Sequence, residues 1–450
     1  MYVLIVCMIM LTLFAYWMGK NDLFNPVFLC VAVFTVSVFA ASYNIEIWHI
    51  DLSPVTVSLI VTSLISMILC GSLTRIMMES FKGTVSRKEM LRSFYVEDWK
   101  YLLVLLLGAV TVVIYVHDIM RIGRAHGFVS GSGISALIKL YRNVSHFSSE
   151  AEDKVSRTAY YSMELFRIAA YFMTYIGLSN VVAERSIKKS LKKNLRYFAV
   201  TVMFLVLILF TGARMQLLKM FIFIILVFFI LSKKKKGWGM SIPITTLFKI
   251  IMCVVALLAL FVILRSFVGR STETDPIYYI TMYAGGSVEL LDLFIKKPLP
   301  PSNIWGKETF YAMYNFLGRN LHKPEWIYVF AKEFRHSHGV SVGNVYSALR
   351  CFYYDFGFFG CVLCSGIVGA AFTSIYTHIR FKRLKKPVDM TVLLYCYLGY
   401  SFCMFSINYY FDYLSFSFIR TLIFFFLMNW FLSDCKLKEN IRFSRLRITS

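Results

Sequence analysis

Apolar runs of membrane-spanning length recur along the whole chain and constrain its fold more than any other feature. A helix that crosses about 30 Å of hydrocarbon needs roughly 17 to 25 mostly apolar residues, and we count about eleven such runs. They lie near residues 2–18, 24–42, 55–73, 101–117, 164–183, 197–211, 215–232, 246–266, 355–377, 390–410 and 415–433. Because backbone groups in lipid must bond to one another, the sequence predicts an all-α polytopic membrane protein.

Composition supports this class and excludes a soluble protein. Hydrophobic residues make up 58% of the chain and charged residues only 16%, and the mean hydropathy is +0.64. A water-exposed surface does not tolerate such values. The first run has neither a basic segment before it nor a small-residue cleavage site after it, so we interpret it as a retained span. We expect one integral membrane domain over residues 1–450.

Lysine and arginine collect in alternate loops and indicate the orientation. More than half of the 48 basic residues would face the cytoplasm if the amino terminus lay outside. They occupy Lys20, loops 75–100, 184–196, 233–236 and 380–386, and the tail 436–447. The net charge of +23 then reflects attraction to anionic lipid. No nucleic-acid-binding module accompanies it, so membrane lipids are expected partners and nucleic acid is not.

Two outer segments are too long to be simple connections. They are residues 118–160 and residues 269–350, and loops of such length usually carry function or are disordered. The second segment contains Trp305, Trp326 and many other aromatic residues, which argues against disorder. We expect short amphipathic helices that lie on the outer leaflet there.

Arg214 interrupts an apolar run that extends from Tyr197 to Ser232. The run is too long for one span and fits two spans joined by a tight turn at Thr211-Gly212. By the loop charges this hairpin opens to the outside, so Arg214 begins the seventh span. A helix N-terminus attracts anions, and a guanidinium adds a two-pronged phosphate donor. We therefore expect Arg214 in catalysis and the nearby Gln216 in substrate binding.

Other arginines fall at the same depth. Arg265 and Arg270 end the eighth span, and Arg350 precedes the ninth. Each could simply anchor its helix to lipid phosphates, which is the common role of terminal arginines. The functional alternative is that they join Arg214 around one anionic substrate.

The stretch NVYSALRCFYYDFGFFG combines donors, an acid and flat aromatic rings, a blend that suits sugar recognition. Its candidate substrate-binding residues, beside the catalytic candidate Arg350, are Asn344, Tyr346, Tyr353, Tyr354 and Asp355. Two alternatives stay open. Tyr353 and Tyr354 could belong to an interfacial aromatic belt, and Asp355 could pair with Arg350 or cap the ninth span.

Seven of the eight histidines lie on or near the predicted outer side. His338 is the first candidate for a general base and His336 the second, because imidazole exchanges protons near neutral pH. A solvated loop histidine is the commoner case. The rival carboxylates are Glu325, Glu308, Asp275 and Glu46. No paired-acid or HExxH pattern occurs, so we expect neither a metal nor another cofactor.

With many spans, a long late outer loop, TGARMQLL at an outer hairpin and NVYSALRCFYYDFGFFG before the next span, the sequence resembles the O-antigen polymerase family of the Wzy type. The resemblance implies a GT-C-like fold of the second GT-C architecture in a bacterial cytoplasmic membrane. It also implies a metal-independent glycosyltransferase. Such enzymes transfer a growing glycan from undecaprenyl pyrophosphate to a new lipid-linked repeat unit on the outer face, in some cases with a chain-length regulator protein.

The resemblance assigns roles to residues of this chain. Arg214, Arg265 or Arg270, and Arg350 would hold the pyrophosphate, and His338 would activate the acceptor hydroxyl. Two alternatives remain. A lipid-linked oligosaccharide flippase would place cations along a midplane cavity, where Lys219 and Arg420 are the available residues. An O-antigen ligase would share the chemistry and differ in its acceptor.

Overall fold

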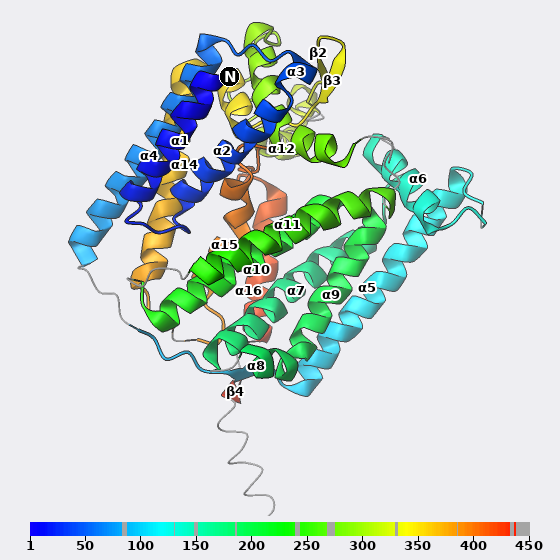
Figure 1. Cartoon of the computed structure of the whole chain (residues 1–450). Coiled ribbons are helices and arrows are strands. Elements are labelled where there is room, and N and C mark those ends of the chain that lie inside the picture. Colours follow the sequence, from blue (N-terminus) through cyan, green and yellow to red (C-terminus); the bar gives the residue numbers. More distant parts are fainter. Residues whose placement is uncertain are drawn as a thin grey trace, which may run out of the picture. The chain divides into compact units, whose positions relative to one another are not determined.

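Helices form almost all of the regular structure, as the computed structural model of this protein shows (Figure 1). The structure describes residues 1–82, 88–129, 131–147, 152–184, 187–238, 244–267, 275–328, 332–384, 386–432 and 436–437. Within these residues the strands form two short antiparallel pairs. The predicted all-α class is confirmed.

Six described helices are long and apolar enough to cross a membrane, which confirms the prediction of a membrane protein. They are Pro26–Tyr43, Pro54–Phe81, Asp98–Ala125, Arg157–Ala183, Arg214–Lys236 and Ala348–Phe381. Shorter apolar helices span Tyr2–Met18, Leu195–Thr211, Met390–Cys403 and Phe416–Phe431. All of these overlap the apolar runs in the sequence. The number of helices that actually cross the bilayer stays a prediction.

The chain divides into two compact units, and the single integral membrane domain over residues 1–450 stays a prediction. The first contains Met1–Ser86, Asp275–Lys382 and Leu398–Arg420, and the second contains Arg87–Thr274, Arg383–Tyr397 and Thr421–Ser450. Helices α15 (Met390–Cys403) and α16 (Phe416–Phe431) each contribute residues to both units.

The first unit is built on long apolar helices that carry the described part of residues 269–350, which the sequence predicts to lie outside and which we call the outer segment. Its elements are α1 (Tyr2–Met18), α2 (Pro26–Tyr43), α3 (Ile45–Trp48), α4 (Pro54–Lys82), α12 (Pro276–Lys296), α13 (Tyr311–Asn320), the 3₁₀ helix η1 (Pro324–Trp326), β2 (Arg335–Ser337), β3 (Val340–Gly343) and α14 (Ala348–Phe381). α4 packs along α14, and α12 packs on α2. Asn25 and Asp275 cap α2 and α12 through their side chains, each followed by proline at the first helical position.

Glycine brings α12 unusually close to α2. A Cβ on Gly285 would lie 2.2 Å from the backbone nitrogen of Ala41, far inside van der Waals contact. Small residues permit such close helix packing in membrane proteins. The contact between Gly285 and Ala41 determines which face of α12 is buried in the unit. Glu289, one helical turn after Gly285, lies on that buried face.

α14 is broken near its start. Gly357 has φ 65° and ψ −164°, values that are not helical, so two helical segments meet there. This combination is open almost only to glycine. The predicted ninth span, residues 355–377, therefore straddles the break, and Arg350 lies in a short helical segment before it rather than in a loop.

The second unit surrounds α7 (Arg157–Ala183), which is almost entirely buried from Phe166 to Val182. Its other elements are β1 (Phe94–Tyr95), α5 (Asp98–Ala125), α6 (Ile134–Phe147), α8 (Ile187–Lys193), α9 (Leu195–Thr211), α10 (Arg214–Lys236), α11 (Ile244–Phe267) and β4 (Lys436–Leu437). α5, α9 and α10 pack against α7. The hydroxyls of Thr174 and Thr201 lie 2.7 Å apart across the α7–α9 contact and satisfy each other inside the apolar core.

The two long outer segments fold as helices over much of their length. Residues 118–160 include the end of α5, all of α6 and the start of α7. Residues 269–350 include α12, α13, η1 and the β2–β3 hairpin. We expected only short amphipathic helices in the second segment. α12, at 21 residues, is longer than that.

Candidate active site

His338 lies at the tip of the β2–β3 hairpin. Ser337 pairs with Val340, so His338 and Gly339 form the two-residue turn, with φ of 48° and 83°. A hairpin turn with positive φ at both positions matches the twist of the strands, and glycine is favoured at the second. The hairpin packs on α12 and α3. The turn therefore holds an exposed histidine on a folded support.

The imidazole of His338 is oriented by main chain. Its Nδ1 lies 3.3 Å from the carbonyl oxygen of Trp48, a residue that is fully buried. A carbonyl can only accept, so this hydrogen bond places a proton on Nδ1, and in the neutral imidazole the lone pair is then on Nε2. His49 lies beside it, with the two ring centroids 5.0 Å apart at an interplanar angle of 70°. The pair offers an oriented base on an exposed edge.

Ser337 and Glu289 form a buried polar pair behind this histidine. The Ser337 hydroxyl lies 2.7 Å from the Trp48 carbonyl and 2.8 Å from Glu289 Oε1. One hydroxyl proton cannot serve both acceptors. The Trp48 carbonyl has a second donor in Nδ1 of His338, so Ser337 can donate to Glu289. Burial raises the pKa of Glu289, and the hydrogen bond from Ser337 offsets part of that rise.

Asp292, one turn further along α12, has a structural task. Its Oδ1 accepts from the backbone N–H of Ser53 at 2.8 Å and from the Thr56 hydroxyl at 2.6 Å, at the start of α4. Lys296 Nζ lies 2.7 Å from its other oxygen. Asp292 is fully buried, and these contacts compensate its charge. It ties α12 to α4 rather than facing a substrate.

Arg350 is a buried cation in the first turn of α14. Only 1% of it is exposed, and its guanidinium pairs with Glu308 and, at 2.8 Å, with Glu333. It also lies over the ring of Phe294, 4.5 Å from the centroid. A buried guanidinium requires such compensation, because removing it from water is costly. Among the described residues its charge is thus already matched by two carboxylates.

The remaining residues of the NVYSALRCFYYDFGFFG stretch contribute to the same folded segment. Asn344 Nδ2 donates to the Lys332 carbonyl at 3.5 Å, and the Tyr354 hydroxyl donates to the Pro300 carbonyl at 2.9 Å. The Tyr346 hydroxyl donates to Glu333 at 3.1 Å. Through these hydrogen bonds the three side chains hold the outer segment to the start of α14.

Two further candidates lie close to Phe294 and to the 308–309 turn. Asp355 accepts from the backbone N–H groups of Glu308 at 3.1 Å and Thr309 at 2.6 Å. The half-buried ring of Tyr353 lies 6.4 Å from that of Phe294. The sequence left two alternatives for Asp355, a pair with Arg350 or a cap. The structure adds a third role: Asp355 orders the loop that brings Glu308 to Arg350.

Arg214 belongs to the second unit. α9 ends at Thr211, Gly212 has φ 69°, and α10 begins at Arg214, so the turn is where the sequence predicts it. Arg214 is 5% exposed. One of its Nη atoms donates to the Phe261 carbonyl at 3.1 Å, and its guanidinium lies 4.0 Å from the Phe261 ring centroid. The structure thus joins the start of α10 to α11.

Arg265 lies one helical turn after Phe261 on α11 and is also buried. Residues four apart share a helix face, so Arg214 approaches the face of α11 that carries Arg265. Gln216 is half-buried in the first turn of α10. Arg270 lies outside the described residues. The structure therefore supports grouping Arg214 with Arg265, while His338 and Arg350 belong to the other unit.

The other candidate bases are dispersed. His336 is exposed in β2, Glu325 lies in η1, Glu46 lies in the first turn of α3 and Asp275 caps α12. Glu308 pairs with Arg350. Sequence reasoning missed Glu289, Ser337, His49 and Glu333. One signal was available: Glu289 and Asp292 stand three apart in the otherwise apolar helix GGSVELLDLF, where an ionisable residue suggests function or a buried partner.

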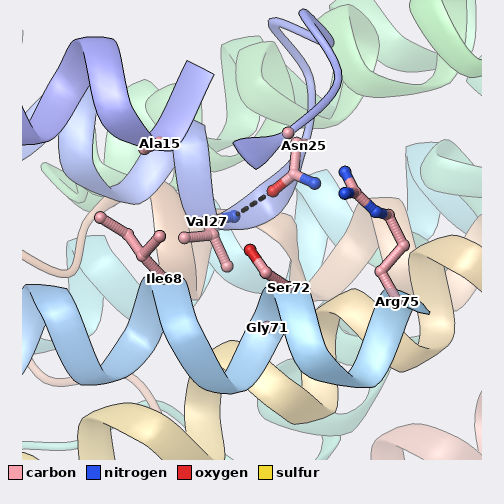
Figure 2. Close-up of a pocket in the computed structure, with 8 residues that line it drawn as sticks. Ala15, Asn25, Val27, Ile68, Gly71, Ser72 and Arg75 are labelled. Atoms are coloured by element: carbon pink, nitrogen blue, oxygen red, sulfur yellow. Dashed lines mark hydrogen bonds between the residues drawn. The ribbon is translucent and has the colours of Figure 1, made fainter. Parts of the chain in front are cut away.

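A small polar cavity in the first unit is shown in Figure 2. Asn25, Ser72 and Arg75 are among its lining residues. Its volume of about 10 Å³ is close to the minimum that one water molecule needs. The Asn25 side chain accepts from the Val27 N–H at 3.0 Å and caps α2. The cavity is too small for a sugar or a phosphate and carries no substrate.

Comparisons of the chain with protein-family models, with curated proteins and with solved structures find no match. The function therefore has to be argued from the chemistry of the site.

Proposed function

We propose that this protein is a GT-C-like membrane glycosyltransferase that polymerises undecaprenyl-pyrophosphate-linked oligosaccharide repeat units. It would act on the outer face of a bacterial cytoplasmic membrane, in the synthesis of a surface polysaccharide. The observation that carries the proposal is the orientation of His338, whose Nδ1 lies 3.3 Å from the Trp48 carbonyl. That contact leaves Nε2 of an exposed hairpin histidine as the proton acceptor that activation of a sugar hydroxyl requires.

In this reaction an acceptor hydroxyl attacks the anomeric carbon of the donor glycan. The hydroxyl oxygen forms the new glycosidic bond, and its proton passes to Nε2 of His338. The bond between the anomeric carbon and the pyrophosphate oxygen breaks, and its electron pair stays on the pyrophosphate. The leaving group gains negative charge, which prepositioned donors must stabilise.

The resemblance assigns the pyrophosphate to Arg214 and Arg265, which belong to the second unit and are tested separately from His338. Both are buried, and the hydrogen bond to Phe261 fixes Arg214 at the N-terminus of α10. A fixed guanidinium at a helix N-terminus stabilises an anion without reorganising. Arg350 receives a positioning role instead, because Glu308 and Glu333 already compensate its charge.

The test uses the full chain in liposomes with undecaprenyl-pyrophosphate repeat units from its own strain, and resolves the lipid-linked glycans by size. Wild-type protein should produce a ladder of integral repeats. His338→Ala and Arg214→Ala should each reduce the rate about a hundred- to a thousandfold, the usual effect of removing a transition-state donor. His336→Ala is the matched control, since His336 is an exposed histidine two residues away.

The other outcomes identify other functions. Loss of the ladder in His336→Ala alone would move the base to His336. Unextended repeat units that become accessible across the bilayer would make the protein a flippase. Transfer of a finished glycan to a different acceptor, without chain growth, would make it a ligase.

A further inference from the structure

The second unit contains a large open cleft that the proposed reaction does not use. Its volume is about 440 Å³, within the range of roughly 300 to 1,000 Å³ typical of small-molecule sites. The lining residues that matter here are Tyr141, Ser145, Lys154, Arg157, Tyr160 and Tyr161. They come from α6, from the start of α7 and from the segment between them, all in the region 118–160 that the sequence places outside.

Polar contacts hold one wall of this cleft in place. The Arg121 guanidinium donates to the carbonyls of Glu152 at 3.1 Å and Lys154 at 2.9 Å. Asp118 accepts from the backbone N–H of Ser156 at 2.6 Å. Both anchoring side chains belong to α5, so the segment before α7 is fixed to a long helix. A wall fixed in this way is preorganised, so a ligand would not have to order it on binding.

A second contact supports the same wall. His126 Nε2 lies 2.7 Å from Asp153 Oδ1, and Asp153 is largely buried. The carboxylate nearest to the cleft in sequence is thus engaged by a histidine. No aspartate or glutamate lines the cleft within the described residues. Its charge comes from Lys154 and Arg157 and is positive.

Three tyrosines supply the aromatic surface. Tyr141 is buried, whereas Tyr160 and Tyr161 are 41% and 44% exposed. The Tyr160 and Tyr161 rings lie 5.6 Å apart at an interplanar angle of 71°, so they present faces in two directions. Tyrosine offers an apolar face together with a hydroxyl donor and acceptor. Sugar rings present the complement, with apolar C–H faces and a rim of hydroxyls.

Lys154 and Arg157 differ in their hydrogen bonding. Lys154 Nζ donates to the Ser145 carbonyl at 2.5 Å, which ties the wall to α6. Arg157 is exposed at the first residue of α7, directly after the cap Ser156. Its guanidinium makes neither a hydrogen bond nor an ion pair with another described residue. An exposed guanidinium beside tyrosine faces suits a carboxylate or phosphate carried on a sugar.

We propose that this cleft binds an acidic saccharide segment of the glycan. Tyr160 and Tyr161 would pack on the sugar rings, and Arg157 would pair with the acidic substituent. The inference rests on the proposed function, because it takes the bound saccharide to be part of the lipid-linked substrate. Its role is to hold the glycan, and no bond is made or broken there.

The experiment measures binding by isothermal titration calorimetry with the full chain in detergent. The probes are the glycan released from the strain's lipid-linked repeat units by mild acid, the same glycan with its carboxyl groups reduced, and inorganic pyrophosphate. The variants are Tyr160→Ala, Tyr161→Ala and Arg157→Gln. The matched controls are Tyr2→Ala and Arg124→Gln, which change exposed residues of the same types elsewhere.

Wild-type protein and both controls should bind the released glycan, and each tyrosine variant should bind it at least tenfold more weakly. Arg157→Gln should lose affinity for the native glycan and equal the wild type on the carboxyl-reduced one. Equal affinity of all variants for the glycan overturns the proposal. So does a glycan without acidic groups, or a wild type that binds only pyrophosphate.

The ladder assay separates this proposal from the proposed function. Polymerisation with unchanged glycan affinity in the cleft variants would disprove the cleft alone. Glycan binding that depends on Tyr160 and Tyr161, without any ladder from the wild type, would disprove polymerisation and leave the cleft as a glycan-binding site.

Discussion

The hydroxyl oxygen of Ser337 lies 2.8 Å from a carboxylate oxygen of Glu289, and both side chains are almost fully buried. The Trp48 carbonyl competes for the same hydroxyl proton at 2.7 Å. Burial raises the pKa of Glu289, so the folded protein holds its neutral form to a higher pH than the unfolded chain does. The pKa of Glu289 is raised and that of Glu333 is lowered, so the two carboxyl groups should change the stability of the fold with pH in opposite directions.

Glu289→Gln should stabilise the protein at neutral pH. The folded-state pKa of Glu289 is raised by burial, so its contribution to stability is complete below the unfolded pKa and is lost as pH rises through the folded pKa. A glutamine amide is neutral at every pH, and its oxygen can accept from Ser337. We expect equal Tm values for variant and wild type near pH 4.5 and a higher Tm for the variant at pH 7.5, by thermal scans in detergent. A lower Tm for the variant at pH 7.5 would show that the ionised form is the native one.

Glu333→Gln should show the reverse dependence. Burial pushes the pKa of Glu333 upward, but Arg350 and hydrogen bonds from Tyr346 and Arg335 bring it below its ordinary value. A lowered folded-state pKa contributes stability above the unfolded pKa that is lost as pH falls through the folded pKa. The variant should therefore be less stable than the wild type at pH 7 and approach it in acid. A pH-independent difference in Tm would contradict the ion pair.

Arg350→Ala should unfold much of the outer segment. It would leave the buried Glu308 without its partner and take one of two arginines from the half-buried Glu333, at a cost of about 3–5 kcal/mol. Lys20→Ala is the control, because Lys20 pairs with Glu79 at 2.7 Å but is 56% exposed, and such pairs contribute about 0–1 kcal/mol. Tm in detergent reports both. If Arg350→Ala keeps the wild-type Tm and loses only activity, Arg350 contacts the substrate as the sequence alone suggested.

Gly285→Ala and Gly286→Ala should differ although the two residues are adjacent. A Cβ at position 285 would meet the Ala41 backbone at 2.2 Å, whereas at position 286 the nearest atom is the Val342 carbonyl oxygen at 3.4 Å. Overpacking of the first kind costs about 1–3 kcal/mol or more, while alanine in a helix is favoured over glycine by roughly 0.8–1 kcal/mol. Gly285→Ala should lower Tm, and Gly286→Ala should leave it unchanged or raise it. Similar effects of the two variants would refute the close α2–α12 packing.

Gly357→Ala should destabilise through the backbone alone. No atom lies within 4 Å of the position a Cβ would take, but φ is +65°, and a side chain in that region costs about 1–3 kcal/mol. Gly131 is the matched control, with equally open space and no positive φ. The difference in Tm between Gly357→Ala and Gly131→Ala reports the cost of placing a side chain at positive φ. Equal values would mean that α14 runs through residue 357 unbroken.

The sequence predicted what depends on local pattern. Apolar runs located the long helices, and Thr211-Gly212 located the turn before Arg214, because span length and glycine act over a few residues. Arg350 and Glu308 were both candidates, but the sequence offered no reason to pair them. Nothing in the local pattern links Arg350 to Glu308, 42 residues earlier, or Ser337 to Trp48, 289 residues earlier. Those pairings come from how α12, α14 and the hairpin pack.

The break at Gly357 also bears on how the chain enters the membrane. A translocon weighs arginine and aspartate at about 2.5–3.5 kcal/mol each near the centre of an inserting helix. With the break at Gly357, we expect the inserting segment to be residues 358–381, which have no acidic residue and no cation before His378. We expect Arg350 and Asp355 to stay outside the hydrocarbon during biogenesis. One glycine would thus let a charged helical segment and an apolar span share a continuous stretch of helix-forming sequence.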